Sequence, residues 1–161
     1  MDIMNYFDLF GLGARFDLDL ASVEKRYFEL QREWHPDQLA AEQRQAAIQK
    51  SADVNQGYHA LKSPLKRAQH LLALQGIRVN TESDTIKPDA ALLAEIMELR
   101  ESLAEGASEA FIADIEAREE ETLTRLQAAF GSENYPQAAA LTLRLNYLSK
   151  LLQDARLQAI A

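Results

Sequence analysis

The heptapeptide EWHPDQL (residues 33–39) interrupts a helical sequence pattern and decides how the first half of the chain folds. Pro36 disfavours helical geometry at the residue before it, so a helix over about 20–34 must end here. A second helix is expected over about 41–62, which makes the heptapeptide the loop of an antiparallel helical hairpin. The apolar residues before the loop recur with the spacing of one helical stripe: Val23, Tyr27, Leu30 and Trp34.

Short helices are expected on either side of this hairpin. The apolar segment 6–10 ends at Gly11, and Asp19 suits the N-cap of the helix that follows. Ser63 and Pro64 suit the N-cap and first position of a helix that ends near residue 76. These elements predict a compact first domain over residues 1–75. The side of the 41–62 helix expected to face inward carries Ile48, Ala52, Asn55, Tyr58 and Leu61.

The second half of the chain predicts a three-helix bundle over residues 89–161, after a linker at 76–88. The segment 80–89 is polar, aperiodic and contains a proline, as linkers and docking loops do. Helices are expected at about 89–105, 108–130 and 136–160, and short connections favour antiparallel neighbours. The acidic run 119–121 is interpreted as a solvated face. The expected inward stripes are Leu92, Ile96, Leu99 and Leu103 on the first helix, and Leu141, Leu145, Leu148 and Leu152 on the last. The fold class is all-α.

Composition and charge exclude several classes of function. The 161 residues contain no cysteine, so disulfides and thiolate metal sites are absent. The net charge of −8 divides into −1 for residues 1–75 and −7 for residues 76–161, and the acidic half would repel nucleic acid. No apolar run approaches the roughly 20 residues of a membrane span, and the N-terminal stretch lacks the basic region of a signal peptide. A cytoplasmic protein is expected.

The sequence offers little for catalysis or metal binding. His35 and Asp37 could form an acid–base pair, but no nucleophile lies beside them, and no phosphate loop, nucleophile elbow or zinc-protease motif occurs. The other two histidines, His59 and His70, are separated by a helix break and are interpreted as ordinary, partly exposed residues. We therefore expect no enzymatic activity, no metal and no cofactor.

The helix before the loop carries a cationic side. At ~100° per residue from Val23, Lys25 and Arg32 lie at ~200° and ~180°, opposite the apolar stripe, with Arg26 on the flank. These cations could belong to a solvated face of mixed charge. Beside an exposed His-Pro-Asp loop, they could instead form a docking patch for an acidic partner.

Together, these segments resemble a known module. The helix VEKRYFELQREW (23–34), the tripeptide at 35–37 and VNQGYHALKSPLKRA (54–68) resemble the J domain, the co-chaperone module of the DnaJ type. With the opening YFDLFGL (6–12), the segments LLAEIMELRESL (92–103) and LRLNYLSKL (143–151) extend the resemblance over essentially the whole chain. It points to the HscB family, co-chaperones of iron–sulfur cluster assembly, in its bacterial form.

The resemblance implies two protein partners. One is a DnaK-type chaperone ATPase, HscA, which the J domain would stimulate through His35, Pro36, Asp37, Lys25, Arg26 and Arg32. The other is the iron–sulfur scaffold protein IscU, held as a client by the C-terminal bundle through Leu93, Ala94, Met97, Glu98, Glu101 and Tyr147. The sequence departs from the family pattern at Gln38, where lysine is usual, at Ala94, where a bulkier residue is usual, and at Tyr147, where another aromatic is expected. The alternative is a J-domain co-chaperone of a general DnaK-type chaperone with a different client.

Overall fold

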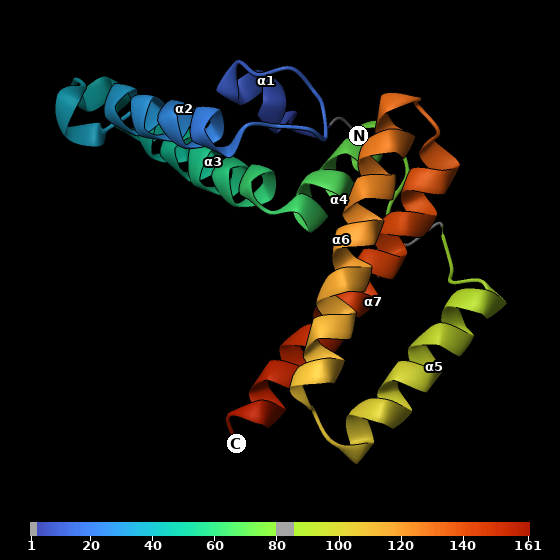
Figure 1. Ribbon diagram of the computed structural model, residues 1–161. Helices are drawn as coiled ribbons and strands as arrows, with labels where there is room; N and C mark the ends of the chain where they lie inside the picture. Colours follow the sequence, from blue (N-terminus) through green and yellow to red (C-terminus); the bar gives the residue numbers. More distant parts are fainter. Residues whose placement is uncertain (1–2, 80–85) are drawn as a thin grey trace. The chain divides into compact units, whose positions relative to one another are not determined.

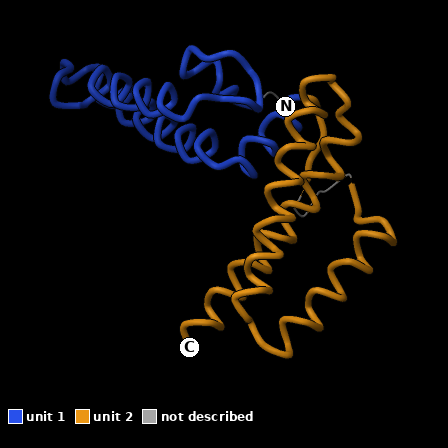
Figure 2. Tube along the Cα trace, in the orientation of Figure 1, with its two compact units in different colours: residues 1–74 blue, residues 75–161 orange. Residues whose placement is uncertain are grey.

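The computed structural model describes residues 3–79 and 86–161, and all regular elements in these ranges are helical (Figure 1). The chain divides into two compact units, residues 1–74 and 75–161 (Figure 2). The expectation of an all-α fold is confirmed. Residues 80–85 of the expected linker lie outside the described residues.

Unit 1 is built around a helical hairpin. Its long helices are α2 (Leu20–Glu33) and α3 (Arg44–Lys62), which pack side by side and are joined by two short 3-10 turns, η1 (Pro36–Gln38) and η2 (Ala41–Gln43) (Figure 1). Two shorter helices, α1 (Tyr6–Phe10) and α4 (Pro64–Leu74), pack against α3. Asp19 caps α2 as expected, because its carboxylate accepts a hydrogen bond from the Ala21 amide.

The buried side of α3 differs from the one expected. The buried residues are Ala47, Val54, Gly57 and Leu61, whereas Ile48 is 55% exposed and Ala52 and Asn55 are also exposed. The reason is the close approach of α1 at Gly57. A β-carbon at this position would lie 2.9 Å from ring carbons of both Phe10 and Tyr6. Gly57 therefore faces α1, since a larger residue at this position would leave no room for the two aromatic rings.

A buried arginine fixes the segment between α1 and α2. Arg67 is 5% exposed, and its Nε and Nη1 donate hydrogen bonds of 2.8 Å to the carbonyls of Leu61 and Phe16. Its guanidinium also lies over the Phe16 ring, 5.6 Å from the centroid. Because burial disfavours the charged form, the pKa of Arg67 is lowered. Its two carbonyl partners offset part of this cost and join segments far apart in the sequence.

His70 is partly exposed, as expected, but it makes specific contacts that the sequence did not indicate. Its Nε2 accepts a hydrogen bond of 3.1 Å from the backbone amide of Tyr6, the first residue of α1, and its ring stacks on Phe7. The imidazole is half-buried, and burial lowers its pKa. A neutral His70 therefore holds the start of α1 against α4.

The described residues of unit 2 form three helices: α5 (Ala90–Glu105), α6 (Glu109–Gly131) and α7 (Tyr135–Ala159). Their caps are Asp89, Ser108 and Asn134. The inward stripe of α7 is confirmed, because all four of its leucines are buried, and on α5 Ile96 and Leu99 are buried. These two side chains pack with Phe111 and Ile115 of α6 and with Leu148, Leu151, Leu152 and Ala155 of α7.

The acidic run on α6 is only partly solvated. Glu120 and Glu121 are exposed, but one carboxylate oxygen of Glu119 is buried without a hydrogen-bond partner. Burial raises the pKa of Glu119, which the charge of Arg156 opposes. The interpretation of the run as a solvated face was therefore wrong for Glu119. The buried stripe continues past the run because Thr122 takes an inward position and donates its hydroxyl to the Arg118 carbonyl.

Candidate functional site

The His-Pro-Asp loop has a defined geometry at the end of the hairpin. His35 is the N-cap of η1, and its Nδ1 accepts a hydrogen bond of 3.2 Å from the Asp37 amide. Pro36 occupies the first position of the turn, where its fixed φ suits the geometry and no amide is needed. The Asp37 side chain is 90% exposed, and its carboxylate lies 3.8 Å from the imidazole. The loop therefore presents a carboxylate to solvent from a pre-ordered turn.

The three cations of α2 differ in their surroundings. Lys25 and Arg32 are exposed, on the same side of the helix. Arg26 is half-buried: its Nε donates 2.8 Å to the Phe10 carbonyl at the end of α1, and its Nη1 pairs with Glu29. Arg26 therefore holds α1 against α2, which leaves Lys25 and Arg32 as the side chains free to meet a partner.

The second candidate surface, which we call the α5 face, consists of Leu93, Ala94, Met97, Glu98, Glu101 and Tyr147. Leu93 is 45% exposed and Met97 is 62% exposed, so neither belongs to the core. Ala94, Glu98 and Glu101 are exposed on the same helix. Tyr147 of α7 is partly buried and packs against the core cluster of the bundle. The five α5 residues thus form an exposed apolar strip with a carboxylate rim, whereas Tyr147 is partly buried against the core of the bundle.

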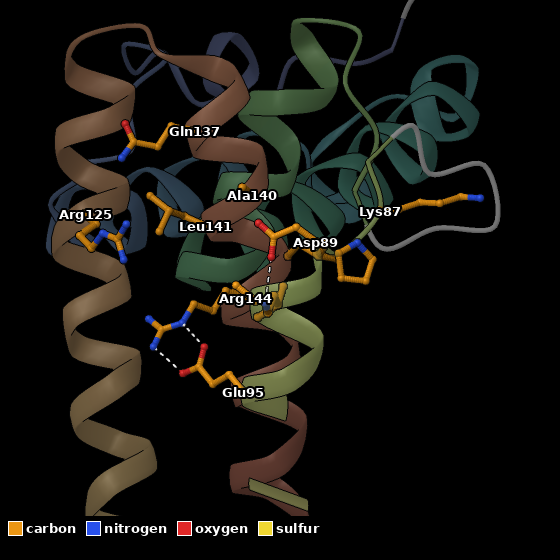
Figure 3. Close-up of a pocket in the computed structure, with 12 residues that line it drawn as sticks. Lys87, Asp89, Glu95, Arg125, Gln137, Ala140, Leu141 and Arg144 are labelled. Atoms are coloured by element: carbon orange, nitrogen blue, oxygen red, sulfur yellow. Dashed lines mark hydrogen bonds and ion pairs between the residues drawn. The ribbon is translucent and has the colours of Figure 1, made fainter. Parts of the chain in front are cut away.

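An ion-pair network that sequence reasoning missed holds α5 in place. The Glu95 carboxylate accepts two hydrogen bonds from Arg144 of α7, at 2.7 and 3.1 Å, and one of 2.8 Å from Arg118 of α6 (Figure 3 shows the Arg144 pair). Arg144 also donates 2.6 Å to the Thr122 hydroxyl. Chiefly because of the Arg144 hydrogen bonds, the pKa of Glu95 is lowered. The sequence feature that could have indicated this network is the position of Glu95, an acidic residue one helical turn from Leu92 and Leu99 on the flank of the apolar stripe.

The same residues border a hollow in unit 2. The hollow of about 380 Å³ lies where the start of α5 faces α6 and α7, and Glu95 and Arg144 form part of its wall (Figure 3). Asp89 also borders it, but its carboxylate caps α5 by accepting 2.8 Å from the Leu92 amide. Glu95, Arg144 and Asp89 are thus already engaged in hydrogen bonds within unit 2.

Within residues 3–79 and 86–161, no group of three or more His, Asp or Glu side chains is arranged to hold a metal ion. No helix in those ranges is both long and apolar enough to cross a membrane. Among the described residues, no hydroxyl side chain forms a hydrogen bond with His35 or Asp37.

Comparison with known proteins identifies relatives of this chain. A family model described as the HSCB C-terminal oligomerisation domain matches residues 88–156. Co-chaperone protein HscB homologs from Vibrio vulnificus and Vibrio cholerae are 35% and 38% identical, over 96% and 94% of both chains. The solved structure of chaperone HscB from Vibrio cholerae has a TM-score of 0.82 at 34% identity, covering 95% of this chain and 96% of that one. Human co-chaperone HscB has a TM-score of 0.86 at 30% identity, covering 99% and 84%.

A helical hairpin with His-Pro-Asp in its loop, followed by a separate helical bundle, defines a J-domain co-chaperone. The J domain is the N-terminal unit, and the three-helix bundle is the C-terminal one. With relatives of more than 30% identity along nearly the full length, the chain belongs to the HscB family of co-chaperones.

Proposed function

We propose that this protein serves iron–sulfur cluster maturation by stimulating the ATPase of an HscA-like, DnaK-type chaperone and delivering an IscU-like scaffold protein to it. Residues 1–75 would act on the ATPase, and residues 89–161 would hold the client. The protein itself carries out no covalent chemistry in this scheme. Since the relatives named above with this architecture include bacterial proteins, we expect it in the bacterial cytoplasm.

The exposed Asp37 carboxylate is the observation that carries the first half of the proposal. At 90% exposure it has no basic side-chain partner other than His35, at 3.8 Å. A carboxylate held at a loop tip can form a charge-assisted, bidentate pair with an arginine of the ATPase. Lys25 and Arg32 would steer an acidic surface of the chaperone toward the loop, and Arg26 would support the orientation of α2.

The α5 face supports the second half. An apolar strip with a charged rim is the usual composition of a protein-binding surface. Leu93 and Met97 provide such a strip, because both side chains lie outside the core and are exposed to solvent. Glu98 and Glu101 would meet basic groups of the client. Tyr147 would contribute the edge of its ring, because much of it is packed against the core.

The test is a single-turnover ATPase assay on an HscA-like chaperone with the wild-type protein, with Asp37→Asn and with His35→Gln, each with and without an IscU-like scaffold. We expect the wild type to stimulate, the scaffold to increase the stimulation, and both variants to be inactive with unchanged helical content. Full stimulation by a well-folded Asp37→Asn protein would refute the role of the loop.

The alternative partner is a general DnaK-type chaperone with a different client. The same assay on a general DnaK, together with a binding measurement on the IscU-like scaffold, separates the two possibilities. Stimulation of the general chaperone alone, without scaffold binding, would favour the alternative. The acidic rim of the α5 face argues for a client with a basic surface in either case.

A further inference from the structure

The α5 face is divided between two helices. Five of its residues lie on α5, whereas Tyr147 lies on α7. A partner that contacts both helices binds tightly when their relative arrangement is fixed beforehand, because ordering a mobile element costs binding free energy. The contacts that hold α5 against α6 and α7 therefore determine how well the α5 face is prepared for a client.

Apolar packing holds the start of α5 less firmly than its middle. Ile96 and Leu99 are buried in the core cluster of unit 2. Leu92, one turn earlier, is only partly buried and borders the open hollow of about 380 Å³ together with Leu141 of α7 (Figure 3). A side chain that faces an open hollow has fewer packing partners than one in a filled core. The segment of α5 that carries Leu93 therefore needs another kind of contact to keep its place.

Glu95 provides such a contact to both of the other helices. Its carboxylate accepts two hydrogen bonds from Arg144 of α7 and one from Arg118 of α6, none longer than 3.1 Å. The side chains of Glu95 and Arg144 are 21% and 15% exposed, so water and salt screen this pair less than a surface pair. Among the described residues, one other hydrogen bond joins α5 to α6 or α7, and it runs from Gln158 to the Leu103 carbonyl at the far end of α5.

The Glu95 network, which consists of Glu95, Arg118 and Arg144, lies at the level of the α5 face. Glu95 precedes Glu98 by three residues, which places the two one helical turn apart on α5. Arg144 precedes Tyr147 by the same interval on α7. The Glu95 carboxylate turns toward the Arg144 guanidinium, as Figure 3 shows. The network thus joins the two helices beside the α5 face, with its polar groups directed at one another.

We propose that the Glu95 network positions the α5 face for client binding: its three residues set how α5 lies against α7 and do not contact the client themselves. This inference rests on the proposed function and adds positioning residues to its second site. Without the network, α5 would hold the binding-competent arrangement for part of the time, and the apparent Kd rises by the reciprocal of that fraction. A bound client would in turn favour the competent arrangement.

Replacing Glu95 by glutamine tests the inference in the full chain. Glu95→Gln keeps the length of the side chain and removes its charge. If α5 then holds the competent arrangement for about one tenth of the time, the Kd for an IscU-like scaffold rises about tenfold, and this is the expected result. Arg144→Gln should have a similar effect, and the double variant should exceed either single variant by no more than about twofold, because residues that act as one unit are not additive. Asp114→Asn is the matched control: it removes the other ion pair of Arg118, which lies within α6, and it should leave the Kd unchanged.

Amide hydrogen exchange separates positioning from a general loss of stability. In Glu95→Gln, exchange should accelerate in α5 while α6 and α7 keep their protection, and bound scaffold should restore the protection of α5. A purely structural role would instead accelerate exchange in all three helices together. Arg118→Gln removes a single hydrogen bond to Glu95 and should show the same changes at a smaller size, and it takes the place of Glu95→Gln if that variant does not fold.

Each outcome decides the inference. If the wild type binds the scaffold and Glu95→Gln binds it within about twofold as tightly, the network does not position the α5 face, while the proposed function stands. Weaker binding in Glu95→Gln but not in Arg144→Gln would mean that Glu95 contacts the client itself. Faster exchange in all three helices would leave the network a structural role alone. Both of these results overturn the inference. If the wild type binds no scaffold, the client half of the proposed function fails, and the inference fails with it.

Discussion

Replacing both Leu93 and Met97 by alanine should weaken client binding by about 30-fold or more, with a smaller loss of stability than the truncation of core side chains would cause. Full burial of a side chain of this size stabilises a protein by about 1.5–3 kcal/mol. Leu93 is 45% exposed and Met97 is 62% exposed, so roughly half of that burial is at stake at each position. The better helix propensity of alanine offsets a few tenths of a kcal/mol per residue. We expect the free energy of unfolding to fall by less than about 2 kcal/mol in the double variant.

The expected effect on binding is larger. If the two side chains anchor the client, their loss should cost about 2 kcal/mol or more, which is roughly a 30-fold increase in Kd. The assay is calorimetric titration of an IscU-like scaffold, together with urea unfolding of the same preparations.

Two control variants make the prediction specific. Leu157→Ala removes a leucine that is 57% exposed on α7 away from the α5 face. It should change neither the free energy of unfolding nor the Kd for the scaffold. Ile96→Ala removes a core side chain that is 5% exposed, and it should destabilise by about 2–5 kcal/mol. Unchanged scaffold binding in a stable Leu93→Ala/Met97→Ala protein would refute the reasoning, as would a loss of stability in the range of Ile96→Ala.

Three further predictions concern residues that the structure singled out. Gly57→Ala should destabilise the fold by up to about 2 kcal/mol in urea unfolding, because overpacking against Phe10 and Tyr6 exceeds the gain of roughly 1 kcal/mol in helix propensity. The control Gly131→Ala, with no atom within 4 Å of the new carbon, should not destabilise it, and a more stable Gly57→Ala protein would contradict the close approach of α1. Glu119 has a raised pKa in the folded protein, so the stability it contributes is present below its pKa in the unfolded chain, near 4.5, and is lost as pH rises. The free energy of unfolding of Glu119→Gln should therefore exceed that of the wild type by up to about 1 kcal/mol at pH 7 and should equal it near pH 4. A difference independent of pH would exclude burial of the carboxylate as the cause. His70 has a lowered pKa in the folded protein, so its contribution to stability is present above its pKa in the unfolded chain, near 6.5, and is lost as pH falls below that value. Between pH 7.5 and pH 5.5, the free energy of unfolding should fall less in His70→Gln than in the wild type. Equal losses would count against the buried imidazole.

Helix positions were predictable from the sequence because their signals are local. Asp19, Ser108 and Pro64 marked helix starts within one residue of where the structure has them, since a cap satisfies amides within its own turn. The inward side of α3 was not predictable in the same way. Ile48 carries more apolar surface than Gly57, but the packing of α1 requires the smaller residue, and that requirement arises from a segment some fifty residues away.

The two proposed sites were predictable to different degrees. The loop at 35–37 carries a distinctive tripeptide, and Leu93 and Met97 fall beside the apolar stripe of α5 by simple periodicity. Glu95 gave almost no signal, because a pair with Arg144 depends on how two helices meet and not on local spacing.

The two surfaces share a construction but carry flanking charges of opposite sign, and we expect this difference to discriminate between the two proposed partners. On α2 the exposed ring of Phe28 lies between Lys25 and Arg32, whereas on α5 the exposed Leu93 and Met97 are flanked by Glu98 and Glu101. Apolar contact alone distinguishes poorly between partners, so the flanking charges must supply much of the discrimination. A chaperone surface acidic enough to bind α2 would be repelled by the carboxylates of α5, and a basic client would be repelled by Lys25 and Arg32. Under the proposed function, each protein would therefore occupy its own unit without competing for the other, as simultaneous binding of ATPase and client requires.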